Sequence, residues 1–393
     1  MKGHIAKKGN KYYIVVDMKD EAGNRKRKWL SGPNGGFEKK RQAELAMPDI
    51  LKALHEETFV EPTKKTFGEI LKVWLEDKKP TVKYNTWKSY EWLVKTHIIP
   101  ALGKIQVLKL RPQHIQDFYY KLLEKLSVGS IRKVHVIIND ALSREVSWGH
   151  IKQNVAQFVK LPSGKKSKFK VLNEEQLKIF LDATKEDQYY EAFEIAASTG
   201  MRQSELLALL WTEVDLKRKI ASVRQAYTLS EDGGHDFDDT KSDSSERPIA
   251  LFPHTAEVLE ALFAKQQQRQ KDNKLYKDSG LVIQTSVGTP LSPRNLMRNF
   301  YRILDKIQEE HPDFPRIRFQ DLRHTHATLL LKAGIHPKIV QERLGHSSVM
   351  VTLDIYSHVL PNLQEAVLKN IGDSITGSST TELGTSESPT LLE

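Results

Sequence analysis

The stretch Phe319–Leu331, FQDLRHTHATLLL, places chemically active side chains on a predicted helix with an apolar edge. Its polar members include Gln320, Arg323, His324 and His326. Three explanations compete for them: a solvated helix face, a metal-binding His-x-His pair, and a site that needs fixed positive charge and hydrogen-bond donors. An arginine stays charged at any physiological pH and offers two parallel donors, so the third explanation predicts an anionic ligand such as phosphate.

The metal-binding explanation is weak. His324 and His326 are two residues apart, so on a helix they point in different directions. No cluster of Asp, Glu or Cys supplies further ligands at zinc-like spacing, and the chain has no cysteine at all. We therefore expect no metal and no cofactor, and we expect both histidines to serve packing or capping.

Three further patterns lie in the second half of the chain. In STGMRQSELLALLW, Arg202 follows a Thr-Gly turn and Glu205 lies at the start of the next predicted helix. In DDTKSDSSERPIAL, Lys241 lies at the tip between two predicted strands. ERLGHSSVMVTLDIYSHV contains His346 and, further along, Tyr356. Each pattern alone is weak evidence, because a loop lysine usually faces solvent and a turn arginine is unremarkable.

Together and in this order, the four patterns resemble the catalytic domain of the tyrosine recombinases, the phage integrase family. That family has an arginine after a Thr-Gly turn, a lysine on a β-hairpin, a His-x-x-Arg helix, Leu-Gly-His, and then a tyrosine. The matching positions are Arg202, Lys241, Gln320 with Arg323, His346 and Tyr356. The resemblance extends upstream to a helical core-type DNA-binding domain and a basic arm-type DNA-binding domain, and it leaves only the tail uncovered.

The resemblance implies exchange of DNA phosphodiesters through a 3′-phosphotyrosyl intermediate, without ATP. Arg202 and Arg323 would stabilise the charge of the pentacoordinate transition state. Tyr356 would attack the phosphorus and conserve the bond energy for rejoining. Lys241 would protonate the leaving 5′-oxygen, and His346 would donate a hydrogen bond to the phosphate or assist the tyrosine proton.

Two positions around this set need comment. Glu205 would brace Arg202 or its neighbours from behind. Gln320 departs from the family pattern, which most often has histidine there. Glutamine can donate a hydrogen bond to a phosphate oxygen, but it cannot exchange a proton near neutral pH. We therefore expect hydrogen bonding from Gln320, with His346 carrying any proton transfer.

Composition agrees with a polyanionic partner. The 393 residues carry a formal net charge of +10 and a pI near 9.3, and the first 41 residues hold twelve basic against four acidic side chains. Such a concentrated excess favours nucleic acid. No apolar run approaches the ~20 residues that span a bilayer, and the N-terminus lacks an apolar signal-peptide core. We expect a cytoplasmic protein without a membrane partner, and the missing cysteines exclude disulfides and thiol catalysis.

Residues 1–60 are predicted to form a small sheet with one helix, the arm-type domain. Strands are expected at 10–17 and 25–30, and a helix at 37–54. In the second strand, lysines and arginines alternate between the two faces. A charged strand can be a guarded sheet edge, but this density of charge favours contact with DNA. The candidate DNA-binding residues are Arg25, Lys26, Arg27 and Lys28.

Residues 61–163 are predicted to be an all-α, core-type DNA-binding domain. Thr66 and Glu69 form a capping box for its first helix. Further helices are expected at 85–99, 112–125 and 127–147. The candidates for contact with the DNA backbone are Lys83, Lys88 and Lys95, although scattered lysines are usually only solvated.

Residues 164–373 are predicted to be a mixed, mainly α catalytic domain of the tyrosine recombinase type, so the fold class is multidomain α+β. Asn173 and Gln176 cap its first helix. Strands are expected near 220–227, 247–251 and 281–284. The Ser/Thr-rich tail 374–393 is predicted to be disordered.

We therefore expect a site-specific DNA recombinase that acts on double-stranded attachment sites of core and arm type. The resemblance implies a homotetramer on DNA, in which Pro361–Ile371 docks on a neighbouring protomer or packs within its own chain. An excisionase or a host DNA-bending protein would be an accessory partner. Two rivals stay open: a DNA-binding regulator with a decayed active site, supported only by Gln320, and a type IB topoisomerase-like enzyme, against which the N-terminal DNA-binding domain argues.

Overall fold

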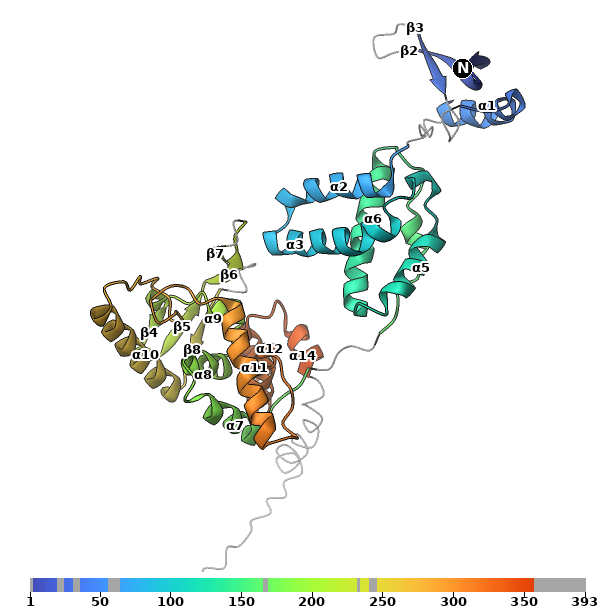
Figure 1. Ribbon diagram of the computed structural model, residues 1–393. Coiled ribbons are helices and arrows are strands. Elements are labelled where there is room, and N and C mark those ends of the chain that lie inside the picture. Colours follow the sequence, from blue (N-terminus) through green and yellow to red (C-terminus); the bar gives the residue numbers. More distant parts are fainter. Residues whose placement is uncertain are drawn as a thin grey trace, which may run out of the picture. The chain divides into compact units, whose positions relative to one another are not determined.

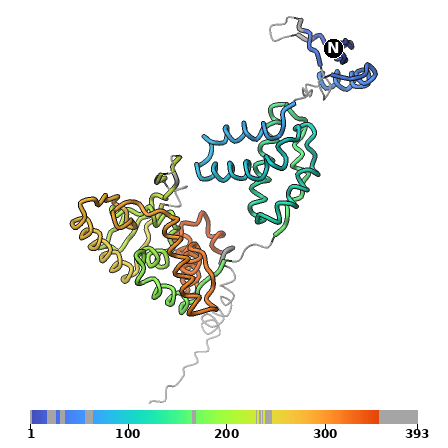
Figure 2. Tube along the Cα trace, in the orientation of Figure 1, coloured from blue at the N-terminus to red at the C-terminus, as the bar shows by residue number. Residues whose placement is uncertain are grey.

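A computed structural model of the chain describes residues 3–19, 25–30, 36–55, 64–164, 169–231, 234–239 and 246–356. The chain divides into two compact units, Met1–Lys166 and Ser167–Glu393. Figure 1 draws their helices and strands, and Figure 2 follows the Cα trace. Helices dominate and the sheets are small and antiparallel, so the predicted multidomain α+β class is confirmed. In the described part of the chain, no helix has both the length and the apolar character needed to cross a membrane.

The N-terminal region is a three-stranded antiparallel sheet with a helix on one face. Strands β1 (Gly3–Lys8), β2 (Lys11–Lys19) and β3 (Arg25–Leu30) pair in that order, and helix α1 (Lys40–His55) follows. Alternate strand residues face the helix and form the apolar core with it: Ile5, Tyr12, Ile14, Val16 and Leu30. The sequence predicted β2, β3 and the helix but missed β1, because GHIAKK is too short and polar to show a strand pattern.

The next region, residues 64–164, is helical. Helix α2 (Phe67–Lys78) begins with the predicted capping box, in which the Thr66 N–H donates to Glu69 Oε2 at 2.7 Å and the Glu69 N–H donates to Thr66 Oγ1 at 3.3 Å. The other helices are α3 (Tyr84–Leu93), α4 (Ile99–Leu102), α5 (Pro112–Leu122) and α6 (Val128–Ser147). A π-helical turn at Val94–Ile98 joins α3 to α4, so the predicted helix at 85–99 continues without a break.

In the C-terminal unit, the described residues combine helices with two small sheets. Strands β4 (Val214–Asp215), β5 (Ile220–Val223) and β8 (Arg247–Ala250) form one sheet in the order β4-β5-β8, while β6 (Gln225–Leu229) pairs with β7 (His235–Asp239) in a second sheet. The helices are α7 (Glu174–Thr184), α8 (Tyr190–Thr199), α9 (Gln203–Leu206), α10 (Pro253–Asp272), α11 (Pro293–Glu310), α12 (Phe319–Lys332), α13 (Pro337–Leu344) and α14 (Val349–Tyr356).

Contacts among these elements gather distant segments of the chain. Helix α12 packs against α8 and α13, and α13 packs against β8 and α14. The end of α8, the start of α12 and the end of α13 therefore meet, although they are far apart in sequence. This meeting point brings together the Thr-Gly, Arg323 and Leu-Gly-His patterns.

Two strand predictions for this unit need correction. Residues 281–284 form only isolated bridges, Leu210 with Leu281 and Gln284 with Pro290, because the chain bends at Val282 and Ile283 between them. The predicted strand at 220–227 divides into β5 and β6, which pair in different sheets. The predicted helix Pro361–Ile371 and the tail 374–393 lie outside the described residues.

Candidate active site

The C-terminal end of helix α13 is bonded by three arginines from different parts of the chain. The last carbonyls of a helix lack intrahelical partners and carry the negative end of its dipole. Three consecutive carbonyls here each accept a hydrogen bond from a guanidinium. The pairs are Arg247 Nε with Arg343 O at 2.7 Å, Arg323 Nη2 with Leu344 O at 2.6 Å, and Arg202 Nη2 with Gly345 O at 3.4 Å. The helix end thus concentrates positive charge beside the Leu-Gly-His turn.

Arg323 is the most deeply placed of these arginines. It lies in the second turn of α12, and only 2% of its surface is exposed. Besides its bond to Leu344, its Nη1 donates to Gly200 O at 2.9 Å. Two carbonyls on opposite sides fix the plane of the guanidinium. Because little water surrounds the charge, its field on a nearby anion is screened less than that of a surface arginine.

Both turns that supply these carbonyls require glycine. Gly200 ends α8 with φ +69° and Gly345 ends α13 with φ +65°, the left-handed conformation that glycine adopts without strain. A Cβ on Gly200 would lie 2.8 Å from Leu344 Cδ2, and one on Gly345 would lie 2.8 Å from Arg247 Nη1. The Thr-Gly and Leu-Gly-His patterns therefore have a structural reason: backbone conformation and close packing around the arginines.

Arg202 lies at the edge of the cluster and caps the short helix α9. Its N–H donates to Glu205 Oε2 at 2.9 Å, and its Nη1 donates to Glu205 Oε1 at 2.5 Å. Its side chain is 36% exposed, so it is more accessible than Arg323. A guanidinium held from behind by a carboxylate, with its outer edge open, can receive a phosphate oxygen.

Glu205 is buried and bonds a second arginine that the sequence analysis did not single out. Arg247 Nη2 donates to Glu205 Oε2 at 2.8 Å, and its Nη1 donates to Oε1 at 3.3 Å. Burial alone would raise the pKa of Glu205, but the hydrogen bond and charge of Arg247, with the charge of Arg202, outweigh it and hold the pKa below its ordinary value. The carboxylate is therefore ionised at neutral pH. A signal existed in the sequence: alternation in β8 places Arg247 and Ile249 on the same, buried face.

His346 follows the turn and carries a neutral imidazole. It is buried, and its Nδ1 lies 2.9 Å from Thr352 Oγ1. Burial, reinforced by the charges of Arg323 and Arg202, lowers the pKa of His346 to about 3. No described residue bonds Nε2, so this nitrogen is the one available to a ligand.

The other polar residues of the opening stretch have different surroundings. Gln320 is the second residue of α12 and is exposed. His324 stacks on Phe169, with ring centroids 4.4 Å apart, and His326 Nε2 accepts from Arg343 Nε at 2.9 Å. Both histidines pack within the unit, as predicted. In the part of the chain that the structure describes, no group of three or more His, Asp and Glu side chains is arranged to hold a metal ion.

For two predicted catalytic residues, Tyr356 and Lys241, the structure does not describe the side chain. Tyr356 is the last residue of α14, the helix that also carries Thr352, and its side chain is not described. Lys241 lies outside the described residues. The strands predicted on either side of it, at 220–227 and 247–251, pair in part, because β5 pairs with β8. The structure adds β7 between them, and β7 pairs with β6, which precedes it in the chain.

The predicted DNA-binding residues of the arm-type domain fall on both faces of the sheet. Arg27 and Trp29 lie on the face opposite α1, where the exposed Trp29 ring has Lys8 Nζ 5.7 Å from its centroid. Lys28 pairs with Val16 and lies on the face that α1 covers. Arg25 and Lys26 belong to β3, but their side chains are not described.

The predicted DNA-binding lysines of the helical region are all exposed. Lys83 precedes α3, while Lys88 and Lys95 lie on either side of one carboxylate. Lys88 Nζ is 3.1 Å and Lys95 Nζ 2.7 Å from the carboxylate oxygens of Glu91. Part of their charge is therefore balanced locally. Their role in binding DNA stays a prediction.

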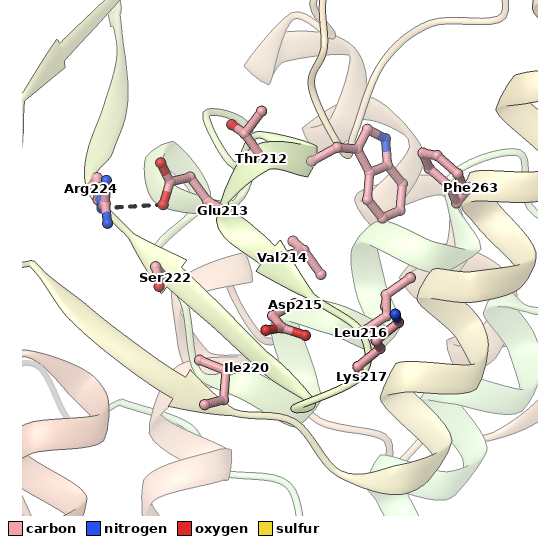
Figure 3. Close-up of a pocket in the computed structure, with 11 residues that line it drawn as sticks. Thr212, Glu213, Val214, Asp215, Leu216, Lys217, Ile220, Ser222, Arg224 and Phe263 are labelled. Carbon is pink, nitrogen blue, oxygen red and sulfur yellow. Dashed lines mark ion pairs between the residues drawn. The ribbon is translucent and has the colours of Figure 1, made fainter.

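A separate hollow of about 590 Å³ lies on the outer side of the β4-β5-β8 sheet (Figure 3). Trp211 and Phe263 form its apolar wall, with ring centroids 5.0 Å apart. Arg224 and Glu213 form an ion pair at 3.2 Å on its other side. None of the candidate catalytic residues that the structure describes lines this hollow.

Comparisons with protein-family models cover most of the chain. The model described as "Phage integrase family" matches residues 170–362. "Phage integrase, N-terminal SAM-like domain" matches residues 66–123, and "Arm DNA-binding domain" matches residues 4–54. The three models follow the order of the three predicted domains.

Known proteins show the same likeness. A "Tyrosine recombinase XerC-like" protein of Caldanaerobacter subterraneus subsp. tengcongensis is 26% identical over 396 residues, which cover 95% of this chain and 98% of that protein. The structure of the Tn1549 transposon integrase in complex with transposon right end DNA matches with a TM-score of 0.68 at 21% identity, over 78% of this chain and 99% of that one. A lambda integrase tetramer bound to a Holliday junction matches with a TM-score of 0.58 at 17% identity, over 88% of this chain and 92% of that one.

Proposed function

Because the chain belongs to the phage integrase family and is a tyrosine-type site-specific DNA recombinase, we propose that the arginine-bound turn after α13 forms its active site with Tyr356 and Lys241. One observation carries this assignment. Arg202 and Arg323 bond neighbouring carbonyls of one turn, so two fixed cations converge where one phosphate can bind. Such convergence suits the transition state of phosphoryl transfer, whose charge is spread over several oxygens.

In the proposed reaction, the phenolic oxygen of Tyr356 attacks the scissile phosphorus of one DNA strand. A P–O bond to the tyrosine forms as the P–O bond to the 5′-oxygen breaks, and the 3′-phosphate stays on the enzyme. Lys241 gives a proton to the departing 5′-oxygen, and the tyrosine proton leaves to solvent. Attack by the 5′-hydroxyl of another strand reverses the step. The number of phosphoester bonds is conserved, so no ATP is consumed.

The surroundings of His346 narrow its proposed role. A pKa of about 3 makes the imidazole a poor base near neutral pH. We assign it hydrogen-bond donation: the Thr352 hydroxyl donates to Nδ1, and Nε2–H donates to a phosphate oxygen. Gln320, exposed at the start of α12, adds a second neutral donor. A histidine at position 320 is then not essential, because hydrogen bonding is all that this position supplies.

The proposed substrate is double-stranded DNA with core-type and arm-type attachment sites of a mobile element that the enzyme integrates or excises. We divide the chain into an arm-type domain (1–60), a core-type domain (61–163) and a catalytic domain (164–373). By analogy with the lambda integrase tetramer on a Holliday junction, we propose a homotetramer in which Pro361–Ile371 docks on a neighbour. An excisionase or a host DNA-bending protein would set the direction of recombination, and we propose that the reaction takes place in the cytoplasm.

The test is covalent capture on a nicked duplex that carries an attachment site, first mapped from the DNA that the protein protects. A nick beside the scissile phosphate makes the fragment with the 5′-hydroxyl short, so this fragment diffuses away after cleavage and cannot rejoin. The wild-type protein therefore accumulates a denaturation-resistant adduct. Tyr356→Phe forms none, because it lacks the nucleophile. Tyr301→Phe, a matched change in α11, forms the adduct as wild type does.

The rival functions give different results. A DNA-binding regulator with a decayed site protects the DNA but yields no adduct from the wild-type protein. A topoisomerase-like enzyme yields the adduct and relaxes supercoiled plasmid, but it does not recombine two attachment sites. If Tyr356→Phe still forms the adduct, Tyr356 is not the nucleophile.

A further inference from the structure

We propose that Arg247 is a positioning residue for DNA cleavage, acting through Glu205 on Arg202. This inference rests on the proposed function, because it gives Arg247 a task only if Arg202 binds the scissile phosphate. Arg247 itself is buried, with 6% of its surface exposed, and bonds groups that in turn hold the reacting residues. All three of its guanidinium nitrogens bond protein groups, so we assign it a supporting role and not that of a phosphate ligand.

The charges of the cluster require a second arginine. Glu205 lies 2.5 Å from Arg202, and a carboxylate so close would cancel most of the field that Arg202 directs at a phosphate. Arg247 lies 2.8 Å from the same carboxylate and shares its negative charge. The Arg202–Glu205–Arg247 triad then carries one net positive charge. Glu205 can orient Arg202 without neutralising it.

The geometry links Arg247 to both halves of the site. Its Nη atoms bond the two oxygens of Glu205, and its Nε bonds Arg343 O, one residue before the Leu-Gly-His turn. A Cβ on Gly345 would collide with its guanidinium, so this turn packs directly on Arg247. The bond to Arg343 O and the packing of the turn therefore hold the Arg247 guanidinium in place beside Glu205.

Arg247 also follows Lys241 closely along the chain. It is the first residue of β8, and its guanidinium therefore fixes the start of this strand against Glu205 and the end of α13. Arg247→Lys keeps the charge but cannot bond both carboxylate oxygens and the carbonyl together, whereas Arg247→Met removes the charge at similar length.

The experiment measures single-turnover cleavage at saturating protein on two nicked attachment-site duplexes. One has the natural scissile phosphodiester, and the other has a methylphosphonate there, which carries no charge and needs less help from Arg202. On the phosphodiester, Arg247→Met should be slower by about 10- to 100-fold, the cost typical of removing a supporting partner, and Arg247→Lys should be intermediate. On the methylphosphonate most of that loss should disappear, as it should for Arg202→Ala.

Two controls separate positioning from damage to the fold. Leu262→Ala removes core volume in α10, away from the turn, and should lower the melting temperature without a comparable loss of cleavage rate. The double variant Arg202→Ala with Arg247→Met should be no slower than Arg202→Ala alone, because both act through one guanidinium.

The outcomes that would overturn the proposal are distinct from those that test the function. Equal losses on both substrates, multiplicative losses in the double variant, or full activity of Arg247→Met would each show that Arg247 does not act through Arg202. If the wild-type protein forms no adduct on the phosphodiester, the proposed function fails instead.

Discussion

The chain uses arginine in two contrasting environments. At the end of α13, Arg323 and Arg247 are almost completely buried, and main-chain carbonyls and one carboxylate fix their guanidiniums. On the outer face of the β1-β2-β3 sheet, the Arg27 side chain is 69% exposed and pairs with Asp17 at 3.3 Å. The same side chain is held in one orientation in the first place and left largely in water in the second.

This difference separates catalysis from affinity. A buried cation acts through a low dielectric on one phosphate at a defined distance, so its contribution to the cleavage rate depends on its orientation. An exposed cation attracts many phosphates weakly, and salt screens the attraction. We therefore expect changes at α13 to alter the cleavage rate and changes on the sheet to alter DNA binding.

The largest effect should come from Arg323→Lys. Lysine keeps the charge, but its single ammonium cannot bond Gly200 O and Leu344 O from a fixed plane while facing a phosphate. Loss of one such electrostatic contact typically costs about 10²- to 10³-fold in rate. Single-turnover cleavage at saturating protein should show this loss, while DNA affinity stays close to that of wild type.

Arg302→Lys is the matched control for that change. Arg302 lies on α11, is half exposed and pairs with Asp187, so the same substitution should leave cleavage unchanged. Equal rates for Arg323→Lys and wild type would mean that charge alone suffices at this position, and the contrast between the two regions would lose its basis.

The next largest effect should be on stability at acid pH, through the buried side chain of His326. Burial, with the charge of Arg343, lowers the pKa of His326 to about 3, below its ordinary value of 6.5. Above pH 6.5 the ring is neutral whether the protein is folded or unfolded. As the pH falls from 6.5 towards 3, only the unfolded chain takes up the proton, so stability is lost across that window.

His326→Gln should reduce this loss, because glutamine can still accept from Arg343 but does not titrate. The slope of unfolding free energy against pH should decrease by about 1.4 kcal/mol per pH unit for the one proton removed. Urea unfolding of the full chain between pH 6.5 and 4 measures it, with the exposed His311→Gln as control. Parallel slopes for His326→Gln and wild type would show that His326 is not the titrating group.

The sequence predicted those parts of the molecule whose signals are local. The capping box at Thr66 and Glu69 was correct because it depends on residues three apart. The set of Arg202, Arg323 and His346 was recognisable because residue types and order along the chain suffice to name it. The structure then places these three residues around a single turn.

The missed features depend on pairing between distant segments. Arg247 was not singled out because its partner Glu205 lies in another element, and β8 meets β5 only after the chain has formed the separate β6-β7 pair. The predicted strand at 281–284 was wrong for a related reason. An apolar run shows that a segment is buried, but it does not reveal whether the chain bends within it, as it does at Val282 and Ile283.

The smallest effect should come from the exposed sheet, where each cation contributes little. Arg27→Ala should weaken binding to an arm-type site by less than about tenfold and reduce the slope of log affinity against log salt by about 0.9, the value for one phosphate contact. Lys40→Ala removes the same charge from α1 on the opposite side of the sheet and should leave the slope unchanged. At saturating protein, Arg27→Ala should cleave a core site at the wild-type rate, because an exposed cation supplies attraction without orientation. An equal slope change in Lys40→Ala would mean that the whole N-terminal region acts as a diffuse charge, and that the sheet presents no particular face to DNA.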